Sequence, residues 1–212
     1  MEKSMEYNEL IKKRRSIRKY LADSVDDNMI EQLVSAAVTA PSGCNSQCWR
    51  FVAIRTPEKI SALAEAVERG VRRFYSDAED ENFIASRVKQ TTFFRNAPVV
   101  ILVYLTEMKY HDPRVEEYYS AKDYGHSEML SALGNPDVLS VGAAVENLLL
   151  KAEELGLGAC WMNDPIVSAE EINEFIGAPE GHRLMSVIPV GKPAYVPREK
   201  QMKPMNEVFE II

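Results

Sequence analysis

Four cations lie within six residues near the start of the chain, in the segment RRSIRKY at 14–20. Guanidinium groups bind phosphate through paired hydrogen bonds, and a serine hydroxyl adds a further donor. The candidate ligands of such an anion site are Arg14, Arg15, Ser16 and Arg18. A solvated basic turn and a nucleic-acid patch remain the alternatives, because runs of charge usually face solvent.

A second group of cations lies near the other end of the chain, in VGKPAYVPREKQMKP at 190–204. It contains Lys192, Arg198, Lys200 and Lys203. These side chains could complete the anion site if the two ends of the chain meet in the fold. The alternative is an exposed basic tail.

A polar loop, APSGCNSQCW at 40–49, falls between an expected helix and an expected strand. Its side chains offer both donors and acceptors, and side-chain amides suit the edge of a polar heterocycle. The polar candidates are Ser42, Asn45 and Gln47, while Pro41 and Gly43 shape the backbone.

The same loop holds two of the three cysteines, Cys44 and Cys48. A zinc site needs four ligands, and the chain offers only one further cysteine, three scattered histidines and no H-E-x-x-H motif. A thiol redox pair more often has two intervening residues at a helix start. We therefore interpret both cysteines as small packing residues and expect no metal site.

The segment GLGACWMND at 156–164 leads from a helix end into a strand. Two glycines allow a ligand to approach the backbone closely. The alternative is a tight turn that buries Trp161 in the core. Fingerprints of other enzyme classes are missing, since the sequence has no G-x-G-x-x-G after a strand, no P-loop and no G-x-S-x-G.

Composition narrows the classes of function. With 25 basic and 32 acidic residues, the net charge of −7 argues against general nucleic-acid binding. No apolar run approaches the roughly 20 residues that cross a bilayer, and the N-terminal residues lack an apolar signal core. We expect a cytoplasmic protein with reduced cysteines and a single domain over 1–212.

Periodicity and boundary residues place the elements. Helices are expected near 7–13, 29–38, 57–67, 138–156 and 168–175, and strands near 50–54, 98–105, 158–162 and 184–190. Ser168 with Glu171 reads as a capping box. The polar stretch 107–137 is expected to form a lid or insertion with its own helix. This mixture predicts an α+β fold with a central sheet covered by helices.

Four segments in this order resemble the FMN-dependent nitroreductase family. They are RRSIR at 14–18, APSGCNSQCW at 40–49, GAAVENLLLKAEELGLGACW at 142–161 and the VGKP…KQMKP ending. The resemblance implies a homodimer with a mixed or antiparallel central sheet and one FMN in each of two interface clefts. It also fits the apolar tail at 208–212, which is expected to dock on the partner.

The resemblance implies an FMN site built from both chains. One chain would supply Arg14, Arg15, Ser16, Arg18, Trp161, Met162, Asn163, Lys200 and Lys203. Its partner would supply Pro41, Ser42, Gly43, Asn45 and Gln47. Within the first set, Arg18 would lie at the N1/O2 edge of the flavin and Trp161 along the ring or near N5.

Several positions depart from the family pattern. Cys48 stands where the family often has proline, and Met202 stands where it often has arginine, which leaves the tail contact with phosphate to neighbouring cations. The family's contacts from the middle of the chain have no clear match here. The candidates for them are Gln90 and Arg95.

The resemblance implies an FMN-dependent oxidoreductase in which NADH or NADPH reduces the flavin and a nitroaromatic, quinone or related acceptor reoxidises it by a ping-pong cycle. No catalytic side chain is required. The candidates for stacking on the substrate are Tyr118, Tyr124 and Phe94. The alternatives are reductive dehalogenation or dehydrogenation on the same fold, a non-enzymatic flavin-binding protein, and a thiol redox protein. A dehalogenase would use a Glu, Tyr and Lys set, for which Glu116, Tyr119 and Lys122 lie in the right region without matching the pattern.

Overall fold

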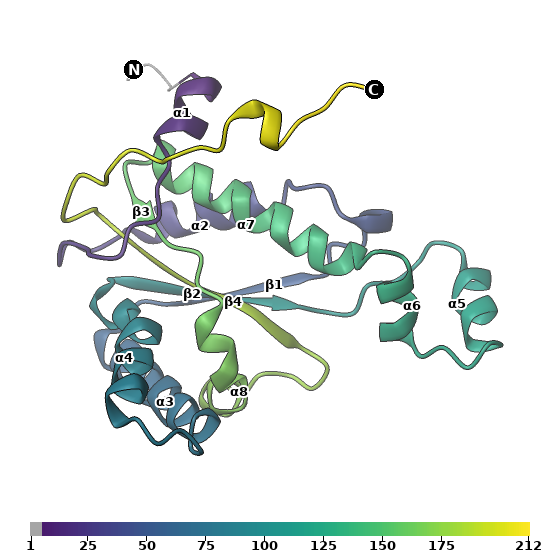
Figure 1. Cartoon of the computed structure of the whole chain (residues 1–212), viewed down its shortest axis with the longest axis horizontal. Coiled ribbons are helices and arrows are strands. Elements are labelled where there is room, and N and C mark those ends of the chain that lie inside the picture. Colours follow the sequence, from purple (N-terminus) through teal and green to yellow (C-terminus); the bar gives the residue numbers. More distant parts are fainter. Residues whose placement is uncertain (1–5) are drawn as a thin grey trace.

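The computed structural model of the chain describes residues 6–212 (Figure 1). Eight α-helices occur in this part of the chain. They are α1 (Tyr7–Lys13), α2 (Asp27–Ala37), α3 (Pro57–Phe74), α4 (Glu81–Thr91), α5 (Pro113–Ser120), α6 (His126–Ala132), α7 (Pro136–Glu154) and α8 (Ala169–Ile176). Short 3-10 helices are η1 (Gly43–Asn45), η2 (Phe93–Asn96), η3 (Asp164–Ser168) and η4 (Met205–Glu207).

A four-stranded antiparallel sheet lies at the centre, in the order β1-β2-β4-β3. Its strands are β1 (Trp49–Ile54), β2 (Val99–Leu105), β3 (Gly158–Ala159) and β4 (Arg183–Gly191). Every residue of β2 is buried, as expected for an apolar, β-branched run in the middle of a sheet. The predicted α+β class with a helix-covered sheet is confirmed.

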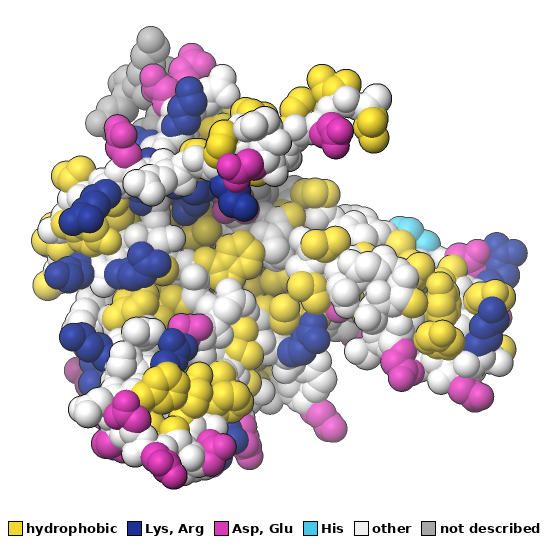
Figure 2. Space-filling view, viewed as in Figure 1, with side chains coloured by type: hydrophobic (Ala, Val, Ile, Leu, Met, Phe, Trp, Pro, Cys, Tyr) yellow, Lys and Arg dark blue, Asp and Glu magenta, His cyan; other side chains and the backbone are white. Residues whose placement is uncertain are grey.

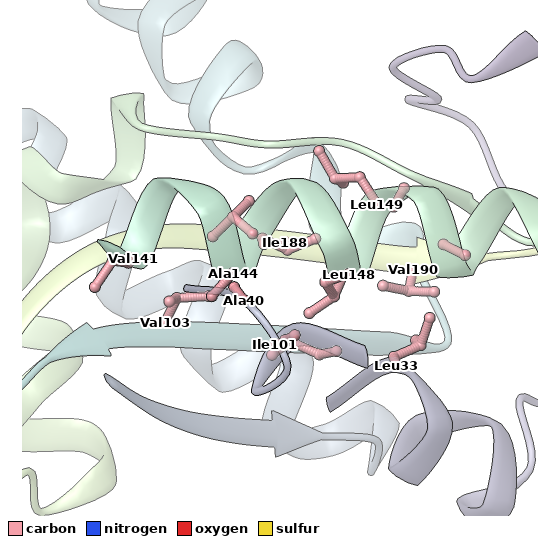
Figure 3. Packing of buried hydrophobic residues seen from close by; sticks show 14 of the residues in the cluster. Leu33, Ala40, Ile101, Val103, Val141, Ala144, Leu148, Leu149, Ile188 and Val190 are labelled. Atoms are coloured by element: carbon pink, nitrogen blue, oxygen red, sulfur yellow. The ribbon is translucent and has the colours of Figure 1, made fainter. Parts of the chain in front are cut away.

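Helices cover both faces of the sheet (Figure 1). Alternate residues of β2 supply the two cores, because successive side chains of a strand point to opposite faces. Ile101 and Val103 pack with α2 and α7, while Leu102 packs with α3 and α8. Figure 3 shows Ala144 and Leu148 of α7 lying over these β2 side chains. The near-continuous apolar run of α7 is thus explained by its burial between the sheet and α2.

The element boundaries depart from the sequence predictions in two places. Helix α4 was not predicted, because its apolar residues are few and widely spaced. The expected strand at 158–162 is paired only at Gly158–Ala159, after which Met162 makes a single bridge to Val187. The tail beyond Glu207 contains no strand in the described structure, and its side chains are exposed.

The predicted capping box before α8 is wrong. The hydroxyl of Ser168 donates to the carbonyl of Val67 at 2.8 Å, and the Glu171 carboxylate accepts from Arg73 at 2.7 Å. Both side chains therefore tie α8 to α3 rather than to the first turn of their own helix. A capping signature in the sequence cannot distinguish these partners, because the competing groups come from a helix about 100 residues earlier.

The segment 107–137 contains α5 and α6, which extend to one side of the molecule (Figure 1). The helix expected there is confirmed, whereas the role of the segment as a lid stays a prediction. Three tyrosines gather on this arm: the rings of Tyr118 and Tyr124 each meet Tyr119 edge to face, at centroid distances of 5.6 and 5.8 Å. In the described residues, no helix has the length and apolar character to span a membrane.

Candidate functional site

Backbone hydrogen bonds bring the first basic segment next to the GACWMND segment. The amide of Ile17 donates to the carbonyl of Ala159 at 2.9 Å, and Ser16 forms a parallel bridge with Ala159. Ile17 is 3% exposed, so it anchors the segment while its neighbours reach solvent. The alternation of buried Ile17 with half-buried Ser16 and exposed Arg18 is typical of an extended strand.

The second basic segment runs beside the first. The amide of Ala194 donates to the carbonyl of Lys19 at 3.0 Å, and the amide of Leu21 donates to the carbonyl of Lys192 at 2.9 Å. Farther along, Nε of Arg15 donates to the carbonyl of Arg198 at 3.2 Å. Residues near the two ends of the chain therefore meet in one place. Figure 2 shows Lys and Arg side chains gathered on this face, where the early and late segments of Figure 1 cross.

The two segments enclose a basic cavity of about 370 Å³. It is lined by Arg14, Arg15, Ser16, Arg18, Tyr195, Pro197, Arg198 and Lys200. Five cations and two hydroxyls surround this space without an acidic lining residue, a donor set that suits a phosphate-like anion. Lys203 is not among the lining residues.

A second cavity of about 360 Å³ adjoins the first. It is lined by Arg18, Gln90, Phe93, Cys160, Trp161, Met162, Asn163 and Asp164. Arg18 lines both cavities, so they meet at its side chain. The second cavity combines apolar surface with amide and guanidinium groups, which suits a flat heterocycle with polar edges. Together the two cavities form the candidate site for the expected flavin, and this site is called the flavin cleft from here on.

The electrostatics of the cleft favour bound anions over reactive thiols. Arg14 is 3.5 Å from Glu146, which holds this guanidinium at the rim of the cavity. Burial raises the pKa of the Cys160 thiol, although Arg18, the Ser16 hydroxyl and Arg14 partly oppose that shift. Cys160 therefore remains protonated near neutral pH, and the thiol supplies no charge to the cleft.

The loop 41–47 does not line either cavity of the flavin cleft. It is held against α7 instead, where the amide of Gly43 donates to Ser140 Oγ at 3.0 Å. Within the loop, Ser42 Oγ accepts from the amide of Gln47 at 3.0 Å. Of the predicted FMN ligands, the structure thus brings together those near 14–18, 161–163 and Lys200. It leaves Pro41, Ser42, Gly43, Asn45 and Gln47 apart from them within one chain.

The backbone of this loop is unusual. Cys44, Asn45 and Gln47 have φ values of 54°, 52° and 46°, in the left-handed region that non-glycine residues rarely adopt. Such strain persists where the surrounding structure enforces it, and it often accompanies ligand contacts. The sequence showed the polar side chains of the loop but gave no signal of this backbone conformation.

The cysteines of the loop do not resemble a redox site. Cys48 is fully buried, and burial raises the pKa of its thiol, with a smaller opposing effect from the Ser46 hydroxyl. Cys44 is half-buried. Over 6–212, no group of three or more His, Cys, Asp or Glu side chains is arranged to hold a metal ion.

The prediction that Phe94 stacks on the substrate is wrong. Its ring is 0% exposed and packs in the core, which leaves no surface for a ligand. Its neighbour Phe93 lines the second cavity instead, together with Gln90 from α4, whereas Arg95 lines neither cavity. Tyr118 and Tyr124 are 58% and 46% exposed, so their rings are accessible.

Sequence reasoning missed several lining residues, including Phe93, Tyr195 and Asp164. The hydroxyl of Tyr195 accepts from the amide of Arg18 at 3.4 Å, a contact that depends on the tail crossing the first basic segment. Asp164 pairs with Arg87 at 3.1 Å, which links the cleft to α4. Of these residues, only Phe93 could be suspected from the sequence, because two adjacent phenylalanines precede β2. The sequence did not show which of the two rings faces the cavity.

Relatives of this chain include two proteins with named activities. Iodotyrosine deiodinase from Nematostella vectensis is 26% identical over 215 residues, which cover 98% of this chain and 75% of that protein. A protein from Archaeoglobus fulgidus named as an NADH dehydrogenase/NAD(P)H nitroreductase is 29% identical over 188 residues, which cover 87% of this chain and 83% of that protein.

Solved structures share the fold over nearly the whole chain. The BluB-like flavoprotein from Clostridium difficile 630 has a TM-score of 0.83 and 29% identity, with 98% of this chain and 99% of that chain covered. A protein from Desulfovibrio desulfuricans, described as a nitroreductase in complex with FMN, has a TM-score of 0.67 and 24% identity, with 99% of each chain covered. The model of the nitroreductase family matches residues 11–192, and the chain therefore belongs to the nitroreductase family of oxidoreductases.

Proposed function

We propose that this protein is an FMN-dependent oxidoreductase that uses NADH or NADPH to reduce nitroaromatic, quinone or related acceptors. The observation that carries the proposal is the pair of adjoining cavities that share Arg18. One cavity has the cations and hydroxyl that a phosphate requires, and the other has the mixed surface that a flavin ring requires. The FMN in the Desulfovibrio structure supports the same ligand.

In this proposal, the basic cavity holds the phosphate of FMN. Arg14, Arg15 and Ser16 contribute from the first segment, and Lys200 and Arg198 contribute from the second. Because these groups come from the two ends of the fold, the phosphate would also hold the segments together. Lys203, which lies outside the cavity lining, is assigned no phosphate contact in this chain.

The second cavity would hold the flavin ring. Trp161, Met162 and Asn163 would lie along the ring, with Gln90 and Phe93 at its border. When bound, the flavin would supply the redox chemistry, accepting hydride from the nicotinamide and passing electrons to the acceptor. Arg18 would stabilise negative charge at the N1/O2 edge of the ring, which is a role for electrostatics rather than for a side-chain acid or nucleophile.

The proposed assembly is a homodimer in which each cleft is completed by the partner's loop. Two observations support it. The loop 41–47 carries polar side chains on a strained backbone but lies apart from the cleft of its own chain. The tail also ends in exposed apolar residues, among them Phe209 and Ile211 at 58% and 84% exposure, and it projects from the molecule in Figures 1 and 2. Contact with a second copy would bury this apolar surface.

A second candidate function is reductive dehalogenation of an aromatic amino acid. The relative named as iodotyrosine deiodinase favours it, as does the exposed tyrosine cluster on α5. On that cluster, Nζ of Lys122 donates to the hydroxyl of Tyr118 at 2.7 Å and lies 4.4 Å from the ring centroid. An ammonium group beside accessible aromatic rings could face the carboxylate of such a substrate.

Turnover with alternative acceptors tests the proposal. The FMN-loaded protein is supplied anaerobically with NADH or NADPH and then with a quinone, a nitroaromatic compound or a halotyrosine. Faster turnover of the quinone or nitro compound supports the first function, and faster halide release supports the second. Bound FMN that neither nicotinamide reduces would contradict both and favour a non-enzymatic flavin-binding protein.

A further inference from the structure

A separate cavity lies where β2 ends, β4 begins and α6 packs beside α7. Its volume is about 670 Å³. It is lined by Leu105, Thr106, Glu107, Met108, His126, Ser127, Leu130, Asp137, Glu180, Gly181, His182 and Arg183. None of these residues lines either cavity of the flavin cleft, so a ligand here would be independent of flavin binding.

Asp137 gives this cavity a buried charge that lacks donors. The residue is 6% exposed, and its Oδ1 atom has no hydrogen-bond partner among the residues the structure describes. Its other oxygen, Oδ2, is 4.0 Å from the guanidinium of Arg183, too far for a hydrogen bond. A buried carboxylate in this state is costly, because desolvation is not offset by donors.

The position of Asp137 favours a negative charge on its side chain but gives its oxygens no hydrogen-bond donor from the residues that the structure describes. It lies in the first turn of α7, where the positive end of the helix dipole stabilises an anion. The exposed Arg183 adds a cation at the mouth, with 57% of its side chain accessible. The carboxylate therefore remains available to a donor that enters the cavity.

The remaining lining residues indicate the kind of ligand. Glu107 and Glu180 add two carboxylates, of which that of Glu107 pairs with Lys109 at 3.5 Å, so Asp137 and Glu180 face the guanidinium of Arg183. The histidines do not change this balance when neutral. Because carboxylates and apolar side chains line the same space, the cation expected here is organic. Leu105, Met108 and Leu130 provide apolar walls for its body.

We propose that this cavity binds a small organic cation, with an ammonium or amidinium group directed at Asp137 and an apolar body against the walls. A charged donor satisfies the carboxylate better than a neutral one, because charge-assisted hydrogen bonds are roughly twice as strong. The volume lies within the usual range of small-molecule sites. The site needs no flavin and no second copy of the chain.

Calorimetric titration of the FMN-saturated protein at pH 8 tests this site with two probes of the same shape. Benzamidine carries an amidinium group, whereas benzamide is neutral. We expect benzamidine to bind at least about tenfold more tightly than benzamide. Asp137→Asn should remove that preference, and Glu31→Gln, which deletes a similar charge on an exposed site of α2, should leave it unchanged.

Two further variants keep the test decisive if Asp137→Asn does not fold. Arg183→Gln removes the competing guanidinium and should strengthen benzamidine binding several-fold, while Glu180→Gln should weaken it. Equal affinities for the two probes, no binding of either probe, or affinities unaffected by all three cavity variants would overturn the proposal. Benzamidine binding that is seen in the FMN-free protein and lost once FMN is bound would overturn it as well, because it would place the probe in the flavin cleft.

Discussion

Ile17 lies directly against Gly158, so closely that no other residue type fits opposite it without a shift. A Cβ added to Gly158 would lie 2.6 Å from Cγ1 and 2.7 Å from Cβ of Ile17. Real Cβ contacts are almost never so short. Because Ile17 is flanked by Ser16 and Arg18, this contact fixes how near the first basic segment lies to the Trp161 side of the cleft.

Gly158→Ala should therefore damage the cleft. The added methyl group pushes Ile17 outward, and overpacking of this kind costs about 1–3 kcal/mol of stability. We expect FMN affinity to fall by about tenfold or more, since displaced cations lose their alignment with the phosphate. Fluorescence titration with FMN and urea unfolding measure the two effects.

Gly125→Ala is the matched control for this change. At that position the nearest atom to an added Cβ is Glu128 Oε2 at 3.4 Å, an ordinary contact. FMN affinity should remain that of the wild type. Wild-type affinity in Gly158→Ala, with the protein folded, would show that the contact does not position the basic segment.

The tail cations should differ in their contribution to flavin binding. Lys200→Ala is expected to weaken FMN binding by about tenfold, because it removes a cation from the basic cavity. Lys203→Ala, which removes the same charge outside the lining, should have a much smaller effect. Titrations at two salt concentrations check this, since loss of a phosphate contact also reduces the salt dependence. Equal losses in both variants would contradict the assignment.

Much of the fold could be predicted from local sequence patterns, and the predictions that failed did so for physical reasons. The buried strand β2 and helix α7 were predicted because their apolar runs are long and strongly patterned. Helix α4 was missed because few of its residues are apolar. The capping signature at Ser168 failed because Val67 and Arg73, distant in sequence, compete for the same side chains.

The candidate site, like the fold, could be predicted from the sequence only in part. The polarity of the segments 14–18 and 40–49 indicated ligand contacts, whereas their separation within one chain was implied only by the family resemblance and not by the residues themselves. Whether Phe93 or Phe94 faces the cleft depends on the turn of a 3-10 helix, which adjacent aromatic residues do not reveal. The cavity around Asp137 left no sequence signal at all, because its lining comes from four separate stretches.

Tyr104 should make the protein less stable at alkaline pH. Burial raises the pKa of this phenol from 10.0 to about 12, with Arg50 partly opposing the shift. Above pH 10 the unfolded chain releases a proton that the folded chain retains, so the free energy of unfolding falls as pH rises from about 10 to about 12. Burial shifts the pKa of Tyr20 in the same direction.

Tyr104→Phe should flatten this alkaline decline. It should also lower stability by about 1 kcal/mol at pH 7, because the hydroxyl donates to Asn173 Oδ1 at 2.9 Å. Urea unfolding between pH 7 and about pH 11 measures both effects, with Tyr7→Phe on the exposed face of α1 as the control. A decline as steep as in the wild type would rule out Tyr104 as its source.

The reactivity of the thiols should show whether Cys44 and Cys48 in the loop form a redox centre. Burial raises the pKa of Cys48 and Cys160, so their thiolates are scarce near neutral pH. Maleimide at pH 7 should label the half-buried Cys44 first, and all three thiols only after unfolding. Replacing Cys44 and Cys48 together by serine should leave reductase activity nearly unchanged. Abolished activity in that folded double variant would instead support thiol redox chemistry.

The tyrosines on α5 and beside it should affect the choice of acceptor. Tyr118→Ala and Tyr124→Ala remove exposed rings that are not part of the flavin cleft. We expect each variant to retain wild-type FMN content while kcat/KM changes several-fold for aromatic acceptors relative to one another. Glu117→Ala on the same helix serves as a non-aromatic control. If every acceptor retains its kinetics in both tyrosine variants, the arm at 107–137 does not contact substrate.

The central claim is that the cavities joined at Arg18 hold an FMN that a nicotinamide can reduce. The most direct measurement is an anaerobic titration of the purified, FMN-loaded protein with NADH and with NADPH, followed through the visible flavin absorbance. The account predicts a yellow protein with one FMN per chain that at least one nicotinamide bleaches, and an Arg18→Leu variant that is bleached far less. A colourless protein that takes up no added FMN, or a bound flavin that neither nicotinamide bleaches, would contradict it.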